Sequence, residues 1–295
     1  MQIDFQAYAE ELALDQHRGN MIPVIEKEII HYEILNALDK DGFLNLLSFQ
    51  GGTCLRLCYG GLRYSEDLDF AAGDAFDDLD PDLLGSSLSQ ALERRFDVRV
   101  RIKKPRAERD FGGVGVKRWW AVVDTAPVRP DIPSQRIKIE VAAVPSHTRE
   151  TNRLQLHYAK LPSSYSTILV NCQTLEEILA DKLIAFSHAE THVRYRDLWD
   201  IPWIWGKLSG MLDKLPELVA FKHADYCCEV PLPIMMKNGA EKALTHLFSD
   251  EFRQQMTRFV PLDVLSRTVE RPEYLELMGK EIGAAYAAAL TSRAV

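Results

Sequence analysis

The stretch from Gly51 to Phe70, which reads GGTCLRLCYGGLRYSEDLDF, constrains this chain more than any other. It opens with two glycines and a threonine, and it ends with Asp67 and Asp69, which one residue separates. Glycines allow a backbone to approach a phosphate closely, and a helix that follows them can present N–H groups to it. Two carboxylates can hold divalent cations beside the same phosphates. The segment therefore indicates metal-assisted phosphate chemistry.

Apolar patterns around this segment predict a mixture of helices and strands. A helical period over 22–39 predicts a helix capped by Asn20, and Asp80-Pro81 predicts a helix that runs to about Phe96. The turn at Gly51-Gly52 is expected to lead into a helix that opens at Thr53. Short apolar or alternating runs predict strands over 43–49, 68–70, 98–103, 119–123 and 136–142.

The C-terminal part of the chain is predicted to be helical. Thr174 is a candidate N-cap for the amphipathic segment LEEILADKLIAFSH, and Glu177 stands at the capping-box position. Pro162-Ser163-Ser164 is typical of a boundary between lobes. We therefore expect an α+β lobe over 1–162 and a mainly helical lobe over 163–295.

Bulk composition excludes several classes of protein. With 295 residues, 46% of them apolar, the chain can bury a substantial core, and two domains fit its length. The five cysteines are odd in number, include one adjacent pair and form no CxxC, so neither a disulfide framework nor a zinc site is indicated. Without a basic-then-apolar N-terminus or a long apolar run, the protein is expected to be cytoplasmic with no membrane partner.

Charge is distributed unevenly along the chain. The net charge of −8 argues against a broad basic surface for nucleic acid. Residues 66–82, however, hold eight acidic and no basic residues, whereas residues 94–118 hold ten basic and three acidic ones. A polyanion that approaches a metal site could use both segments. A solvated hairpin with one basic face explains the basic segment equally well.

Three carboxylates are the candidate metal ligands. On a strand, Asp67 and Asp69 would point to the same face and could reach one metal ion or a pair of ions. Glu140, in the strand predicted over 136–142, could supply a third carboxylate. The alternatives are a surface turn for the two aspartates and a cross-strand salt bridge for Glu140.

Other residues of the opening segment are candidates for holding a triphosphate. Gly51, Gly52 and Thr53 could bring backbone N–H groups to it, or could form an ordinary turn capped by Thr53. The side chains of Arg56 and Arg63 could neutralise the triphosphate or could simply be solvated. Ser65 is a neighbouring hydroxyl that could contact the nucleotide.

The helical segment adds Lys182 and Asp197. A lysine can serve as a point charge for phosphate, and an aspartate can orient it or orient an arginine. An interhelical ion pair without a ligand is the alternative.

Three blocks, GGTCLRLCYGGLRYSEDLDF, IKIEV and EEILADKLIAFSHAETHVRYRDLWDI, together resemble the AbiEii/AbiGii-type nucleotidyltransferase toxins, including the MenT-like group. The resemblance covers about 43–205. It implies a DNA polymerase β-like nucleotidyltransferase core with a helical C-terminal lobe that completes the active site. It also implies Mg²⁺ or Mn²⁺, an NTP donor and a cognate antitoxin.

The resemblance further assigns roles to residues. Asp67 and Asp69 match the metal ligands, and Lys182 and Asp197 match the phosphate-site lysine and its partner acid. In the MenT-like group the acceptor is RNA, typically the 3′ end of tRNA, and its extension stops translation. Nucleotidylation of a protein or small molecule, phosphate transfer from the same site, and a non-catalytic binding protein are the alternatives.

Overall fold

The computed structural model describes residues 4–105, 109–110, 113–127, 131–208 and 212–291. The chain divides into two compact units, which are described separately below. Unit 1 comprises Met1–Asp110 and Gly115–Cys172, and unit 2 comprises Phe111–Val114 and Gln173–Val295.

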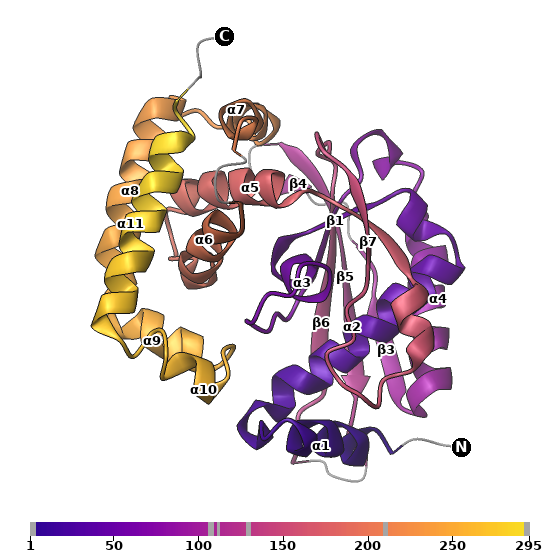
Figure 1. Ribbon diagram of the computed structural model, residues 1–295. Coiled ribbons are helices and arrows are strands. Elements are labelled where there is room, and N and C mark those ends of the chain that lie inside the picture. Colours follow the sequence, from indigo (N-terminus) through magenta and orange to yellow (C-terminus); the bar gives the residue numbers. More distant parts are fainter. Residues whose placement is uncertain (1–3, 106–108, 111–112, 128–130, 209–211, 292–295) are drawn as a thin grey trace. The chain divides into compact units, whose positions relative to one another are not determined.

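Unit 1 is built on a mixed sheet (Figure 1). Among the described residues its strands are β1 (Ser48–Gln50), β2 (Leu68–Ala71), β3 (Arg99–Lys103), β4 (Arg109–Asp110), β5 (Val114–Asp124), β6 (Gln135–Ala142), β7 (Glu150–Arg153) and β8 (Leu169–Cys172). Their order is β3-β5-β6-β2-β1-β8-β7, with β4 paired to β5. β2 therefore lies inside the sheet, parallel to β6 on one side and antiparallel to β1 on the other.

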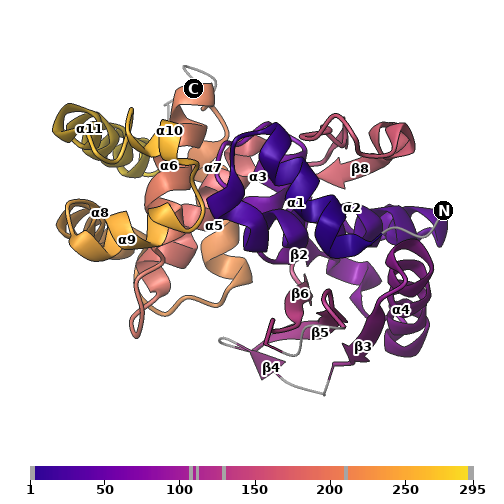
Figure 2. The ribbon, with the colours of Figure 1, turned by 90° about the horizontal axis from the view of Figure 1, so that it is seen from below.

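Unit 1 also contains helices, most of which contact this sheet, while the first packs on the second (Figure 2). They are α1 (Phe5–Asp15), α2 (Ile22–Lys40), α3 (Gly51–Leu57) and α4 (Pro81–Phe96), with short 3-10 turns at Gly19–Met21, Phe43–Asn45, Gly73–Phe76 and Ser163–Thr167. α2 contacts α1, α4 and β6, and nearly all of its side chains are buried. α2 is therefore buried on most of its sides within the core of the unit and does not face the core with a single amphipathic stripe.

Several sequence predictions for unit 1 are confirmed, and others need correction. Asp80 caps α4 through hydrogen bonds to the backbone N–H groups of Asp82 and Leu83, and α4 ends at Phe96 as expected. The predicted strand over 43–49 is wrong, because Gly42, at φ +77°, turns the chain into a 3-10 turn and only Ser48–Gln50 is extended.

One helix cap and one helix start in unit 1 differ from the predictions. α2 begins at Ile22 as predicted, but Met21 is its N-cap residue and no side chain caps it, so Asn20 is not its cap. α3 begins at Gly51, two residues before the predicted start at Thr53.

Among its described residues, unit 2 is helical from α5 onward. Its helices are α5 (Leu175–His188), α6 (Tyr195–Leu208), α7 (Leu215–Asp225), α8 (Leu232–Leu247), α9 (Asp250–Thr257), α10 (Leu262–Leu265) and α11 (Pro272–Ala288). α5 contacts α6, α7 and α8, while α11 packs on α6 and α8. The side chain of Thr174 accepts a hydrogen bond from the N–H of Glu177, which confirms the predicted cap.

Residues 163–172 do not follow the expected division at Pro162. β8 pairs in parallel with β1, at Cys172 and Phe49, so this stretch belongs to the sheet of unit 1. The boundary between the units therefore falls after Cys172. No helix in the described part of the chain is both long and apolar enough to cross a bilayer.

Candidate active site

Three carboxylates gather on two neighbouring strands of unit 1. Asp69 lies within β2, where its Cα is the register partner of Glu140 in β6 and of Gln50 in β1. Asp67 precedes Asp69 by two residues, which places both on one face of an extended backbone. The side chains of Asp67 and Glu140 are each 25% exposed, so solvent and a ligand can reach them.

Lys138 lies among these carboxylates, and the sequence analysis assigned it no role. Its Nζ is 3.7 Å from Oδ2 of Asp67 and 3.3 Å from Oε2 of Glu140. Burial alone would lower the pKa of Lys138, but the carboxylates of Asp69, Glu140 and Asp67 outweigh it and raise the pKa above its ordinary value. The ammonium of Lys138 therefore already neutralises part of the negative charge of these carboxylates. The signal in the sequence was the two-residue spacing of Lys138 and Glu140 on one strand face.

Glu140 also makes the cross-strand salt bridge that was its alternative role. Arg118 of β5 is its register partner, and Nε of Arg118 donates to Oε2 of Glu140 at 2.9 Å. The same carboxylate thus stands between Asp69 on one neighbouring strand and Arg118 on the other. The position of Glu140 is thus compatible both with a role as a third metal ligand and with a cross-strand salt bridge.

The two glycines of α3 are required by their neighbours. Gly51 has φ +76°, and a Cβ there would lie 2.7 Å from Oδ2 of Asp69. A Cβ on Gly52 would lie 2.5 Å from Nη2 of Arg63 and 2.9 Å from Oγ of Ser65. Side chains at either position would collide with these groups. The structure thus brings Asp69, Arg63 and Ser65 to the first turn of α3.

Thr53 ties this turn to the strand that carries the aspartates. Its Oγ1 donates to the backbone carbonyl of Asp67, and the residue is buried. The hydroxyl therefore positions the start of β2 rather than capping α3, whose N-cap residue is Gln50.

The two arginines of the opening segment differ in their surroundings. Arg56 is buried, and its guanidinium donates to both carboxylate oxygens of Glu28, at 2.8 and 3.2 Å, and to the carbonyl of Gly61. This bidentate pair favours a structural role for Arg56 over triphosphate binding. Arg63 is also buried and donates from Nη1 to the carbonyl of Tyr64 at 2.7 Å, but its Nη2 faces Gly52.

Within unit 2, Lys182 of α5 lies in a buried ion cluster. Its Nζ is 2.8 Å from Oδ1 of Asp197 and 2.7 Å from Oδ2 of Asp200, both on α6. Arg194 donates from Nε to the other oxygen of Asp197 at 2.6 Å. The predicted pairing of Lys182 with Asp197 is therefore present, and Asp200 and Arg194 are further members that the sequence analysis did not identify.

The charges of this cluster hold Asp197 ionised. Burial opposes ionisation, but Arg194 and Lys182 outweigh it and hold the pKa of this carboxyl well below its usual range. The side chains of Lys182, Asp197 and Asp200 are 8%, 4% and 5% exposed. Such an arrangement matches a structural ion pair, while Arg194, at 43% exposed, is the member that solvent reaches.

The donor set of unit 1 fits a hard divalent cation. Carboxylate oxygens are the protein ligands that Mg²⁺ and Mn²⁺ prefer, and Asp67, Asp69 and Glu140 supply them from adjoining strands. These oxygens are not drawn together to within 4.8 Å of one another; among the described residues only a group of thiols is so close. The ammonium of Lys138 contributes the positive charge at this place.

Comparison with known proteins places the chain in a family. Residues 33–278 match the family model described as the nucleotidyl transferase AbiEii toxin of type IV toxin–antitoxin systems. Because the match covers most of the chain, the protein belongs to this family of nucleotidyltransferase toxins. A type IV toxin–antitoxin family implies an antitoxin and an NTP substrate.

A solved structure supports the fold. The chain is similar to MenT4, a nucleotidyltransferase toxin from Mycobacterium tuberculosis H37Rv, with a TM-score of 0.53 and 16% identity over 97% of this chain and 99% of that one. It is also similar to JHP933 from Helicobacter pylori, with a TM-score of 0.46 and 18% identity over 90% and 91% of the two chains. No curated protein matches significantly. The predicted α+β nucleotidyltransferase fold is confirmed.

Proposed function

We propose that this protein transfers a nucleoside monophosphate from an NTP to the 3′ hydroxyl of an RNA, with tRNA as the first candidate acceptor. The observation that carries the proposal is the meeting of Asp69, Glu140 and the glycine turn of α3 in unit 1. In this reaction the 3′ oxygen attacks the α-phosphorus, the bond to the bridging oxygen breaks, and pyrophosphate leaves. Extension of tRNA in this way would block translation.

Asp67, Asp69 and Glu140 are the groups that we assign to holding Mg²⁺ or Mn²⁺. When bound, such an ion would supply charge stabilisation to the phosphates and lower the pKa of a hydroxyl. Gly51 and Gly52 leave room for a triphosphate beside Asp69, and Arg63 and Ser65 border the same turn. Lys182 and Asp197 stay predictions for phosphate binding, because their observed partners explain them equally well.

An exposed basic strand supports an RNA acceptor. In β3 the residues alternate in exposure, so that Arg99, Arg101 and Lys103 all face solvent. The next basic residue, Lys104, pairs with Asp82 of α4 at 2.5 Å, and Arg99 lies 3.8 Å from Asp124 of β5. Residues 106–108 and 111–112 of the basic segment lie outside the described residues. Contacts of such side chains with phosphates should make RNA binding sensitive to salt.

The direct test is incubation with Mg²⁺, each of the four α-labelled NTPs and total tRNA. Wild-type protein is expected to label tRNA, and Asp67→Asn is expected not to. Asp78→Asn is the matched control, because Asp78 is an exposed carboxylate of the same acidic segment. Label on tRNA with the wild type and the control alone would establish the acceptor and name the nucleotide.

Other outcomes separate the alternatives. Label on protein or on a small molecule, with none on RNA, would contradict the RNA acceptor while keeping nucleotidyl transfer; the net charge of −8 is the observation that favours this alternative. Release of a nucleoside diphosphate, followed with γ-labelled ATP, would replace nucleotidyl transfer by phosphate transfer. No turnover with folded wild-type protein on any acceptor would contradict both.

A further inference from the structure

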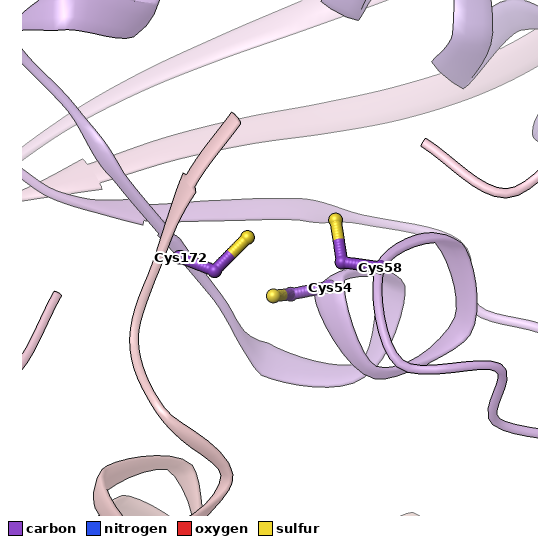
Figure 3. A group of neighbouring side chains, drawn as sticks. All are labelled: Cys54, Cys58 and Cys172. Carbon is purple, nitrogen blue, oxygen red and sulfur yellow. The ribbon is translucent and has the colours of Figure 1, made fainter. Parts of the chain in front are cut away.

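Three thiols from two distant segments of the sequence meet in unit 1. Cys54 lies on α3, Cys58 is the C-cap residue of that helix, and Cys172 ends β8. Their sulfur atoms all lie within 4.8 Å of one another, and all three residues are buried. Figure 3 shows the three side chains close together, with Cys54 and Cys58 at the helix and Cys172 at the strand. We call this group the thiol cluster.

We propose that the thiol cluster is a binding site for a thiophilic divalent cation, with Zn²⁺ as its first candidate. Zinc binds thiolate sulfur at about 2.3 Å, so three sulfurs around one ion lie roughly 4 Å apart. The observed spacing requires only a small contraction. Soft thiolate ligands select zinc over Mg²⁺, so this site is chemically distinct from the carboxylates of β2 and β6.

The surroundings of the thiol cluster leave its sulfurs available to a metal ion. Sγ of Cys172 donates to the carbonyl of Val170 at 3.6 Å, a long contact whose proton a metal ion would displace. Contact with Cys54 and Cys58 lowers the pKa of Cys172 to about 5, contact with Cys172 raises the pKa of Cys58, and burial raises that of Cys54.

Metal binding would exchange the thiol protons of the cluster for the ion. The exchange is Zn²⁺ + 3 RSH giving [Zn(SR)₃]⁻ + 3 H⁺, with no change in oxidation state. The two positive charges of the ion offset two of the three thiolate charges, so a single negative charge is buried.

The position of the thiol cluster gives the ion a structural consequence. α3 carries Gly51 and Gly52 at its start, Cys54 within it and Cys58 at its C-cap. β8 lies next to β1 in the sheet, at the pair Cys172 and Phe49. A metal ion held by all three sulfurs would fix α3 to β8, and it would thereby stabilise the helix that carries the glycine turn.

The chain offers a matched background for testing this proposal. Of its five cysteines, Cys227 and Cys228 lie outside the thiol cluster, so Cys227→Ser/Cys228→Ser leaves only the three clustered thiols. The reduced full-length protein in this background is titrated with Co²⁺, and the thiolate-to-cobalt charge-transfer absorption is followed before Zn²⁺ is added in competition. We expect one ion per chain, displacement by Zn²⁺, and a rise in Tm with Zn²⁺.

Single replacements then assign the ligands. Cys54→Ala, Cys58→Ala and Cys172→Ala, each in the same background, should weaken cobalt binding by more than roughly tenfold. The Tm of each variant without metal shows that it is folded, and two folded variants suffice. The proposal is overturned if the three reduced thiols give no charge-transfer absorption, if absorption survives these replacements, or if the thiols form a disulfide under the titration conditions.

Discussion

The carboxylate group of unit 1 and the ion cluster around Lys182 in unit 2 contain similar residues in different surroundings. Lys138, Asp67 and Glu140 are each about a quarter exposed, and Nζ of Lys138 lies 3.3 Å from Glu140 and 3.7 Å from Asp67. Lys182, Asp197 and Asp200 are at most 8% exposed, and Nζ of Lys182 lies 2.8 and 2.7 Å from the two carboxylates. Lys138 is thus partly exposed and loosely paired with its carboxylates, of which Glu140 is also bound by Arg118 at 2.9 Å, whereas Lys182 is buried and tightly paired.

This difference indicates which of the two groups of charged residues can take up a ligand. Carboxylates at long distances from a lysine can exchange that partner for a metal ion, since little direct pairing is lost. Short buried pairs resist such exchange, because removal of either charge leaves the other desolvated. We therefore expect changes in unit 1 to alter activity and changes in the Lys182 cluster to alter stability.

The largest expected effect is that of Asp69→Asn. Loss of a metal-holding carboxylate beside the glycine turn should lower nucleotidyl transfer about a thousandfold, which corresponds to about 4 kcal/mol. Its Tm should stay near that of the wild type. Transfer rates and thermal unfolding are measured together, with Asp78→Asn as the exposed control. An active Asp69→Asn would contradict the role of the carboxylates.

Lys182→Met is expected to act on stability. It leaves Asp197 and Asp200 buried without the ammonium between them, and only Arg194 remains near Asp197, so the free energy of unfolding should fall by about 3 kcal/mol. Denaturant unfolding measures this, and Lys237→Met, at an exposed position of α8, is the control. Unchanged stability with lost nucleotide binding would show instead that Lys182 serves a ligand.

Gly52→Ala tests how tightly the glycine turn of unit 1 is packed. Its Cβ would meet Arg63 at 2.5 Å and Ser65 at 2.9 Å, so we expect a loss of about 1–3 kcal/mol in stability together with weaker NTP binding. Gly283→Ala is the control, since no atom lies within 4 Å of its added Cβ. Equal behaviour of the two variants in unfolding and NTP titrations would show that the turn is not tightly packed.

Lys138→Gln tests whether the lysine competes with the metal. Without its charge the carboxylates should bind Mg²⁺ about fivefold more tightly, or about 1 kcal/mol, as measured by calorimetry on the folded chain. Lys40→Gln, at an exposed position, should leave the affinity unchanged. Weaker Mg²⁺ binding by Lys138→Gln would mean that the lysine orients the carboxylates rather than competing with an ion.

The smallest effect is a pH dependence of stability. Because the pKa of Asp197 is lowered in the folded chain, the unfolded chain takes up its proton first, so stability is present above the unfolded pKa of about 3.9 and falls as pH decreases toward the folded value. Between pH 6 and 4 the loss is about 0.3 kcal/mol for this group. Unfolding of the wild type and of Asp197→Asn across this range measures the difference, which should vanish if Asp197 is not paired.

Local features of the chain were predictable where a few neighbouring residues decide them. Asp80 and Thr174 cap their helices because each side chain reaches backbone N–H groups two or three residues away. The alternation of Arg99, Arg101 and Lys103 is a property of one strand. By contrast, the strand predicted over 43–49 failed because Gly42 redirects the backbone, which apolar content alone does not show.

The predictions for the candidate site show the same difference between local and long-range features. The spacing of residues along one segment predicted that Asp67 and Asp69 lie together after a glycine turn, and Asp69 lies in β2 with Asp67 directly before it. It also offered the ion pair of Lys182 with Asp197 as one of two interpretations, and this pair is present. The position of Glu140 beside Asp69 follows from the pairing of β2 with β6, which the sequence does not show. The ion pair of Arg56 with Glu28 likewise appears only in the three-dimensional structure.

The cysteines are the clearest case of this division. In the sequence they show no ligand spacing, because Cys172 lies more than a hundred residues after Cys54 and Cys58. The pairing of β8 with β1 brings the three sulfurs together. Strand pairing joins distant segments through backbone hydrogen bonds that every residue type except proline can donate and accept, so the sequence of one strand does not name its partner strand.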